Sequence, residues 1–268
     1  MMVADTLALL SSSQQVLLEI DAISVQFGGI AALSGVSLSV RAGTLHGLIG
    51  PNGAGKTTLI NCISRLVEPQ SGKMKFAGHD LLSYKPHSVA KLGISRTFQN
   101  FGLIEQLSVL DNVLAGMHCV LPGTIVDDIL LAGKSNAQER YARVRARDAL
   151  EMLGLSRFEN RTVSTLPYGT RKSVELARAI AVDPKLVLLD EPTAGLNQLE
   201  MNALRRILMA LRDVHALTIL VISHHLEFLL GLVDEITVLD LGRRIAHGDP
   251  ALIKSDAAVI AAYIGTDQ

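Results

Sequence analysis

One glycine-rich stretch carries the strongest chemical signal in the sequence. Residues 50–57 read GPNGAGKT, a full match to G-x-x-x-x-G-K-[ST], and they lie between the apolar run LHGLI and the helix-forming segment KTTLINCIS. Glycines allow successive backbone N–H groups to point inward at phosphate oxygens, and a helix N-terminus adds a positive dipole. We therefore expect Lys56 to reach the β- and γ-phosphates of a nucleotide and Thr57 to bind Mg²⁺. The expected nucleotide contacts are Gly50, Pro51, Asn52, Gly53, Ala54, Gly55, Lys56, Thr57 and Thr58.

Two further apolar runs end in side chains suited to hydrolysis. KLVLLD ends in Asp190, which is followed by Glu191, and carboxylates at the end of a buried strand are costly unless a cation compensates them. A Mg²⁺ nucleotide supplies that cation, so Asp190 fits a metal-holding role and Glu191 fits a base that orients or deprotonates water. His224 follows LTILVIS and could contact the γ-phosphate or position Glu191, although the adjacent His225 leaves open which ring faces the nucleotide. Gln99, in SRTFQN, could reach Mg²⁺ or the water.

The elements that must position these residues alternate between strands and helices. LHGLIG, KLVLLD and LTILVIS are nearly continuous apolar runs followed by helical patterns, as in parallel strands covered on both faces. GVSLSVRAG instead alternates, which predicts a half-exposed antiparallel strand. Between residues 100 and 164 no comparable strand occurs, and SVLDNVLAGMH and ERYARVRARDALEML predict helices. The sequence therefore predicts a parallel α/β core that carries a helical insertion.

Composition excludes several classes of protein. With 268 residues, 49% hydrophobic, 19% charged and a net charge of −1, the chain fits one large domain or two closely joined ones. No excess of Lys and Arg provides a nucleic-acid footprint, so we expect no nucleic-acid partner. The insertion contains a cluster of arginines, but acidic residues lie among them, which favours a solvated helix face. That cluster comprises Arg140, Arg143, Arg145 and Arg147, with Glu139, Asp148 and Glu151.

Targeting signals and disulfides are not expected. The first basic residue is Arg41, so no basic segment precedes an apolar one as in a signal peptide. No run reaches the roughly 18 apolar residues that a membrane-spanning helix needs. Cys62 and Cys119 are two thiols in a chain without an export signal, so a disulfide is not expected. The positive mean hydropathy, +0.33, fits buried parallel strands and is also consistent with an apolar docking face.

Taken together, the motifs GPNGAGKTT, RTFQN, LPYGT, LVLLDEP, AGLN and VISHH resemble, in this order, the ATP-binding subunit of ABC transporters. The resemblance extends over nearly the whole chain from about Val16. It implies an α/β fold: a P-loop NTPase cassette with a parallel-sheet core, an antiparallel β subdomain and a helical subdomain. Residues 1–14 would be a tail and 15–268 a single ATP-binding domain, with the helical subdomain at about 100–175 and a C-terminal helix at about 250–265.

The resemblance also implies roles for individual residues. Phe27 would stack on adenine, Gln99 would be the Q-loop residue that helps to hold Mg²⁺, and His224 would be the switch histidine. The signature that contacts the ATP of a facing subunit would be Leu166, Pro167, Tyr168, Gly169 and Thr170. The D-loop would be Ala194, Gly195, Leu196 and Asn197.

This sequence departs from the general family pattern at three places. LSGGQ is replaced by LPYGT, the D-loop aspartate by Asn197, and the acidic residue before the switch histidine by Ser223. Pro167 has no N–H and replaces a serine hydroxyl that would bind phosphate. We therefore expect a signature that still closes over ATP through Gly169, with one polar contact fewer, at a cost of about 1–3 kcal/mol. The Thr170 hydroxyl is a candidate replacement.

The chain more closely resembles the branched-chain amino-acid importer group in FGGIAALSGVSLSV, GISRTFQN, the helical insertion after NVLAGMH, LPYG, AGLN and the ending VIAAYIG. This implies an ATPase that works at the cytoplasmic face of the inner membrane with a second ATPase subunit, two membrane-spanning permease subunits and an external solute-binding protein. Importers for urea, amides or aromatic acids remain alternatives. A soluble ABC ATPase of DNA repair or translation is a rival, disfavoured by the single cassette, the lack of a long coiled coil and the balanced charge. A non-hydrolysing nucleotide-binding module is disfavoured by the full set of expected catalytic residues.

Overall fold

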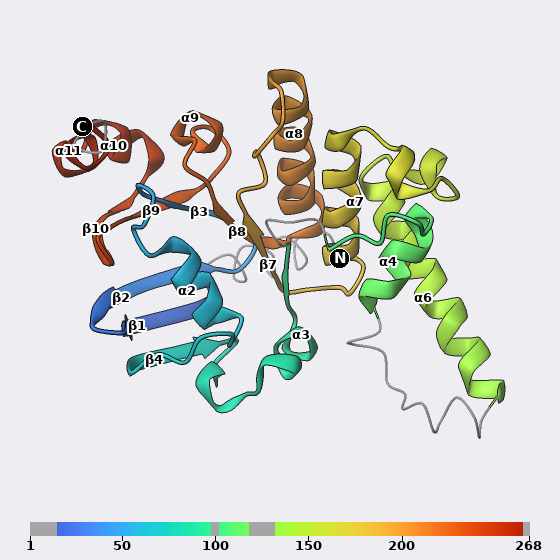
Figure 1. The fold of residues 1–268 in the computed structure, drawn as a ribbon, viewed down its shortest axis with the longest axis horizontal. Coiled ribbons are helices and arrows are strands. Elements are labelled where there is room, and N and C mark those ends of the chain that lie inside the picture. Colours follow the sequence, from blue (N-terminus) through green and yellow to red (C-terminus); the bar gives the residue numbers. More distant parts are fainter. Residues whose placement is uncertain (1–14, 98–101, 118–131, 265–268) are drawn as a thin grey trace, which may run out of the picture.

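The computed structural model describes residues 15–97, 102–117 and 132–264 (Figure 1). Its centre is a six-stranded sheet in the order β10-β9-β3-β8-β7-β6. The strands are β3 (Leu45–Ile49), β6 (Ile94–Arg96), β7 (Leu186–Asp190), β8 (Thr218–Ile222), β9 (Glu235–Asp240) and β10 (Arg243–Gly248). Neighbouring strands from β9 to β6 run parallel, and β10 pairs antiparallel with β9 at one edge. Every residue of β3, β7 and β8 is buried, which confirms the prediction made from their continuous apolar runs.

Helices connect and cover these strands. α2 (Lys56–Ile63) follows β3, α8 (Gln198–His215) follows β7, and α9 (Leu226–Leu229) follows β8, while α3 (Val89–Leu92) precedes β6. Short 3-10 turns occur at Leu81–Ser83, Pro86–Ser88, Ser156–Phe158 and Val163–Thr165. None of the helices in the described ranges is long and apolar enough to cross a membrane.

A second, antiparallel sheet packs beside α2 and has the order β2-β1-β4-β5. Its strands are β1 (Val16–Phe27), β2 (Ile30–Arg41), β4 (Ser71–Phe76) and β5 (His79–Asp80). In β2, Val36, Leu38 and Val40 are buried whereas Ser37 and Ser39 are half-buried, so the predicted alternation is confirmed. The buried face joins a cluster that also contains Leu59 and Ile63 of α2.

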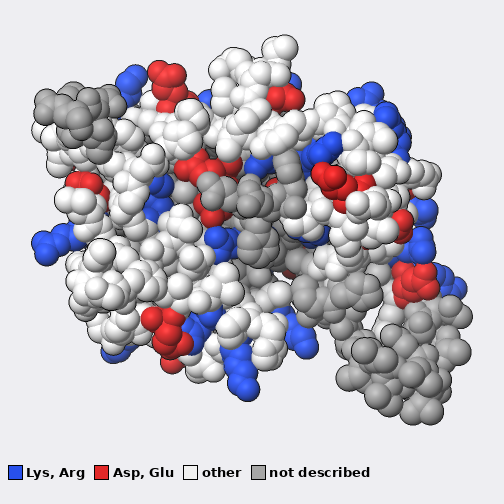
Figure 2. Space-filling view, viewed as in Figure 1, with Lys and Arg blue, Asp and Glu red and all other residues white. Residues whose placement is uncertain are grey.

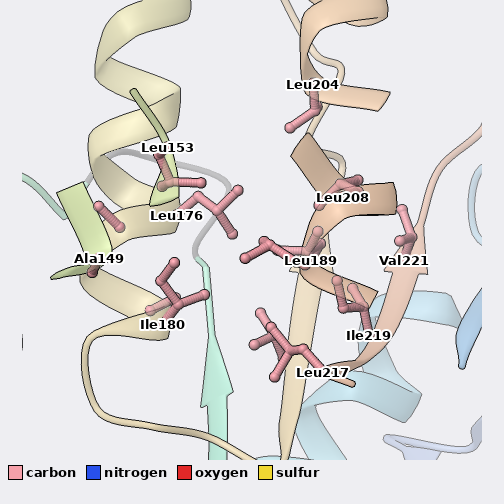
Figure 3. Close-up of a cluster of buried hydrophobic side chains, with 14 of the residues drawn as sticks. Ala149, Leu153, Leu176, Ile180, Leu189, Leu204, Leu208, Leu217, Ile219 and Val221 are labelled. Atoms are coloured by element: carbon pink, nitrogen blue, oxygen red, sulfur yellow. The ribbon is translucent and has the colours of Figure 1, made fainter. Parts of the chain in front are cut away.

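The predicted helical insertion forms α4 (Val109–Met117) and α6 (Ala132–Met152), which pack with α7 (Tyr168–Ile180) on one side of the large sheet (Figure 1). Figure 3 shows how this part is attached: Leu176 and Ile180 of α7 extend towards Leu189 of β7. The same cluster continues to Leu208 of α8 and Val221 of β8. One hydrophobic core therefore joins the helical part to the sheet that carries the catalytic candidates.

Three arginines of α6 are paired with carboxylates: Arg143, Arg145 and Arg147. Arg143 lies 2.9 Å from Glu139 one turn away, and Arg147 lies 3.1 Å from Glu159. Figure 2 shows acidic and basic side chains interspersed on this part of the drawn face rather than a continuous basic stripe. This agrees with the prediction of a solvated helix face.

The C-terminal segment differs from the expected single helix at 250–265. It forms two helices, α10 (Pro250–Ser255) and α11 (Ala257–Ile264), separated at Asp256. Asp256 has an extended backbone, with φ −68° and ψ 125°, and its carboxylate accepts hydrogen bonds from the N–H groups of Ala258 and Val259. An aspartate cap of this kind begins a new helix and ends the preceding one. The predicted tail, residues 1–14, and Gly265 lie outside the described residues.

Candidate active site

Three neighbouring strands of the large sheet deliver the candidate residues to one edge. β8 lies between β3 and β7, and all three run parallel, so their carboxyl ends lie side by side. The glycine-rich loop follows β3, Glu191 follows β7, and His224 comes shortly after β8. The carboxyl edge of parallel strands is where open α/β sheets bind ligands.

The loop between β3 and α2 requires glycine at its two ends. Gly50 has φ 151°, and a Cβ placed on it would collide with the Leu239 carbonyl oxygen. Gly55, with φ 100°, precedes α2, and a Cβ there would lie 2.6 Å from the Ala32 carbonyl oxygen. The backbone can therefore fold tightly against β2 and the β9–β10 turn, whose Gly242 N–H donates to the Ala54 carbonyl at 3.1 Å. Neighbouring elements hold the loop in place at both ends.

The Lys56 side chain folds back onto the glycine-rich loop. The Lys56 ammonium donates to the carbonyl oxygens of Gly50 at 2.7 Å and Pro51 at 2.8 Å, and the residue is only 7% exposed. Burial lowers the pKa of Lys56, and the carboxylates of Glu191 and Asp190 oppose that effect. Its positive charge is thus placed within the electrostatic reach of the two candidate carboxylates.

The first turn of α2 exposes N–H groups and hydroxyls beside the lysine. Thr57 is exposed and Thr58 half-buried, and the turn contains no acidic side chain that would compete with an anion. Of the loop residues, Asn52 and Gly53 are exposed while Pro51 and Ala54 are buried. This end of the helix can therefore present N–H donors and hydroxyl oxygens to a phosphate and its cation.

Asp190 is 4% exposed and is paired with an arginine that no sequence motif indicates. The Arg96 guanidinium lies 2.9 Å from the Asp190 carboxylate and 2.7 Å from the Asn61 side-chain oxygen. Arg96 ends β6, which pairs with β7, so the pair connects neighbouring strands separated by 94 positions in the sequence. Its only local signal was a basic residue at the end of a short apolar run, ISR.

Glu191 has an unusual backbone and a direct contact with His224. Its φ is 49°, in the left-handed region that non-glycine residues rarely occupy, and its N–H donates to the Ile222 carbonyl at 3.0 Å. The Glu191 carboxylate lies 2.8 Å from Nδ1 of His224. His225 packs its ring beside that of His224, and its N–H donates to the Ser223 hydroxyl. Of the two adjacent histidines, His224 is therefore the one bonded to Glu191.

The LPYGT and AGLN segments lie next to each other. Leu166 is buried, Pro167 occupies the N-cap position of α7, and Tyr168 donates its hydroxyl to the Ala194 carbonyl at 3.2 Å. Asn197 caps α8, where it forms a reciprocal capping box with Glu200. An asparagine caps a helix as well as an aspartate does, so the departure at this position preserves the local structure. Figure 1 shows α2 and α7 well apart, with β7 and β8 between them.

Phe27 and Gln99 differ in what the structure shows of them. Phe27 ends β1 and is 52% exposed, next to a turn at Gly28 and Gly29. Its hairpin partner β2 packs against the glycine-rich loop at Gly55, so the hairpin that carries this exposed ring contacts the loop. Gln99 lies outside the described residues.

A tyrosine from the C-terminal helix also belongs to this neighbourhood. Burial raises the pKa of the Tyr263 phenol, the Gly50 backbone opposes this, and the Glu191 carboxylate adds to it. Its side chain packs against the main hydrophobic cluster. In the sequence it is one aromatic residue in VIAAYIG, and no local pattern indicates that this helix returns to the start of the loop.

A glycine-rich loop with its lysine, followed by two carboxylates and a histidine on neighbouring parallel strands, defines a nucleotide-hydrolysing α/β protein. Comparison with known proteins specifies the family. The model for the ABC transporter family matches residues 33–194, and that for the branched-chain amino acid ATP-binding cassette transporter matches residues 243–268. The chain belongs to the ABC transporter family and is its ATP-hydrolysing cassette.

Individual relatives cover nearly the whole chain. The high-affinity branched-chain amino acid transport ATP-binding protein BraF of Pseudomonas aeruginosa is 34% identical over 93% of this chain and 98% of its own. LivG of Escherichia coli, with the same description, is 35% identical over 94% of this chain and 98% of its own. The ADP conformation of MJ1267, an ATP-binding cassette of an ABC transporter, superposes with a TM-score of 0.83 at 33% identity, covering 94% and 100% of the two chains. The predicted family and fold class are confirmed.

Proposed function

We propose that this chain powers the import of branched-chain amino acids by hydrolysing ATP on a membrane transporter. The observation that carries the proposal is the convergence of Lys56, Asp190 and the Glu191–His224 pair at the carboxyl edge of three adjacent strands. The named function of relatives that match more than nine-tenths of the chain supports the choice of substrate.

Within this proposal each side chain has a chemical task. Glu191 is the base that orients or deprotonates the attacking water, and the His224 ring holds its carboxylate at 2.8 Å. Lys56, together with backbone N–H groups of the loop, binds phosphate oxygens, and the exposed Phe27 ring stacks on adenine. Gln99 helps to place the water and the cation. The left-handed backbone at Glu191 is consistent with a side chain held in a specific direction.

The oxygen donors at the loop fit Mg²⁺. Magnesium prefers carboxylate, hydroxyl and water oxygens, and the exposed Thr57 hydroxyl and the Asp190 carboxylate are of this kind. Asp190 already accepts from Arg96 through Oδ2, which holds the carboxylate in one orientation. When bound, the cation would neutralise charge on the phosphates. Thr57, Asp190 and the Gln99 amide are the residues proposed to hold it.

A second ATPase subunit would complete the site. The segment Leu166–Thr170 is proposed to contact ATP held by the facing subunit, through the N–H groups at the start of α7. Pro167 contributes no donor there, which is consistent with a signature centred on Gly169. The D-loop, residues 194–197, is proposed to lie at the same subunit interface.

A groove between β6, α3, α4 and α7 is the proposed contact for the permease. Its volume is about 600 Å³, and apolar side chains such as Val89, Ile94 and Ile104 line most of it. Arg96 and Arg178 are its charged lining residues among those that the structure describes. We therefore propose that a cytoplasmic segment of one permease subunit, apolar with an acidic residue, binds here, and that an external solute-binding protein delivers the amino acid. Under this proposal the chain works as a peripheral subunit at the cytoplasmic face of the inner membrane.

The test is solute uptake by the complex, purified through a tag on this chain and reconstituted into vesicles together with its solute-binding protein. ATP-dependent uptake of leucine that excess isoleucine inhibits and urea does not is the expected result. Uptake of urea or an amide instead would move the substrate to the alternative importer class. Copurification with no membrane subunit, together with ATP hydrolysis, would favour a soluble ABC ATPase.

A separate variant tests the role of Glu191 as the catalytic base. Glu191→Gln keeps the shape of the side chain and removes the base, so ATP hydrolysis should fall by about 10²- to 10⁴-fold while ATP still binds. Glu227→Gln makes the same change at an exposed position of α9 and should leave turnover unchanged. Undiminished turnover in the Glu191 variant would assign catalysis to another residue.

A further inference from the structure

The signature and the D-loop are connected within one chain by a tyrosine. Tyr168 is the third residue of LPYGT, and its hydroxyl donates to the Ala194 carbonyl, 26 positions away, at 3.2 Å. Ala194 is the first residue of the D-loop, three positions after Glu191. The side chain that replaces a glycine of the common LSGGQ pattern therefore bonds to the segment that follows the proposed base.

The ring of Tyr168 also packs closely against Gly195 of the D-loop. Gly195 has φ 76°, and a Cβ placed on it would lie 2.8 Å from the Tyr168 ring and 3.1 Å from its hydroxyl. Real Cβ atoms do not approach this closely, and the left-handed backbone further favours glycine. The D-loop glycine and the signature tyrosine thus pack closely together, and a shift of either segment would disrupt this contact.

A second contact holds the same two segments together. A Cβ on Gly169 would lie 2.7 Å from the carboxyl carbon of Glu200. Glu200 accepts from the Asn197 N–H at 3.0 Å, and its own N–H donates to the Asn197 side chain at 3.0 Å. The signature therefore packs directly on the capping box that ends the D-loop, so both ends of the D-loop are in contact with it.

The D-loop in turn is bonded to the backbone of Glu191. The Ala194 N–H donates to the Glu191 carbonyl at 3.1 Å, and the Glu191 carboxylate accepts from Nδ1 of His224 at 2.8 Å. A displacement at Tyr168 can thus reach Glu191 through one side-chain contact and one short turn.

We propose that Tyr168 is a positioning residue that transmits engagement of this chain's signature to Glu191 of the same chain. The inference rests on the proposed function, in which the signature closes on ATP held by the facing subunit. Closure of the signature on the ATP of the facing subunit would then displace the D-loop through the contact between Tyr168 and Gly195. Occupancy of the facing subunit's ATP site would therefore set the rate of hydrolysis at this chain's own site. The coupling uses contacts that are all within this chain.

The test is the ATP dependence of hydrolysis by the full complex carrying Tyr168→Phe, which removes the hydroxyl and keeps the ring. One hydrogen bond of this kind corresponds to about a fivefold change, so kcat should fall about fivefold while KM changes less than twofold. The Hill coefficient should fall from near 2 towards 1, a change that a purely structural role would not cause. Tyr141→Phe, an identical change on the exposed surface of α6, is the matched control.

A second pair of variants tests the ring contact. Gly195→Ala should lower both kcat and the Hill coefficient, and adding Tyr168→Ala should relieve the clash, so that the two effects are not additive. Additive effects, or a Tyr168→Phe complex with the wild-type Hill coefficient and kcat, would overturn the inference while the ATPase function stands. A wild-type complex that hydrolyses ATP without cooperativity would also overturn it. A wild-type complex that does not hydrolyse ATP would refute the proposed function itself.

Discussion

Lowering the pH should destabilise this protein through one buried histidine, His46, in the strand that leads into the glycine-rich loop. His46 is 1% exposed, and its Nε2 lies 2.9 Å from the Thr237 hydroxyl, which lies 2.9 Å from Nδ1 of His247. Its Nδ1 is 3.8 Å from the Glu235 carboxylate, whose other oxygen binds Arg41. Burial lowers the pKa of His46 to about 3, with further electrostatic contributions from His247 and Arg41.

The sign and size of the effect follow from that pKa. The folded value, about 3, lies below the ordinary value of 6.5, so between these limits the unfolded chain binds a proton that the folded chain does not. The free energy of unfolding therefore falls as the pH falls below 6.5, by about 1.4 kcal/mol per pH unit at full slope. Between about pH 7 and pH 5 the expected loss from this one residue is about 2 kcal/mol. Because pH 5 is well above the pKa of His46 in the folded protein, this loss of unfolding free energy depends mainly on the pKa of His46 in the unfolded chain.

The assay is urea unfolding at pH 7, 6 and 5 for the wild type and for His46→Gln. Glutamine keeps an amide nitrogen near the position of Nε2, so the bond to Thr237 can persist without a titrating ring. Each protein is compared with itself across the three pH values, which cancels the constant effect of the substitution on the free energy of unfolding. His215→Gln, at an exposed site on α8, should behave like the wild type. Equal pH slopes for the wild type and His46→Gln would refute the reasoning.

Two further predictions concern the site. Arg96→Leu should destabilise the protein by about 3–5 kcal/mol, because it leaves the buried Asp190 carboxylate unpaired, whereas Arg143→Leu on the exposed face of α6 should cost less than about 1 kcal/mol. Equal shifts in the urea midpoint would contradict this. Gly169→Asp should abolish uptake-coupled ATP hydrolysis, because its side chain would collide with Glu200 and bring negative charge to a phosphate-facing turn. Unchanged coupled hydrolysis would show that this turn does not contact ATP.

The fold was predictable where the pattern is local. β3, β7 and β8 were recognisable as covered strands because a buried strand is apolar at every position, and β2 because its two faces differ. The two C-terminal helices were predicted as one because their apolar spacing continues across the break. What separates them is the hydrogen bonding of a single side chain, Asp256, to the following N–H groups.

The site was predictable to the extent that its residues follow strands. Asp190, Glu191 and His224 come at or just after the ends of apolar runs, and the carboxyl ends of neighbouring parallel strands meet at one edge. The choice between His224 and His225 needed the backbone of the loop after β8, which directs one ring to Glu191. Sequence order contains no information about that direction.

The sequence by itself determined the chemistry of this protein: a loop of glycines with one lysine, two carboxylates after a buried strand, and the order of the motifs. These are properties of residue type and short spacing, which local periodicity reveals. Only the tertiary structure decided that Arg96 holds Asp190, that Tyr263 approaches Gly50, and that Tyr168 contacts the D-loop. Each joins segments far apart in the chain, and such contacts depend on how the sheet, the helical part and the C-terminal helix pack together.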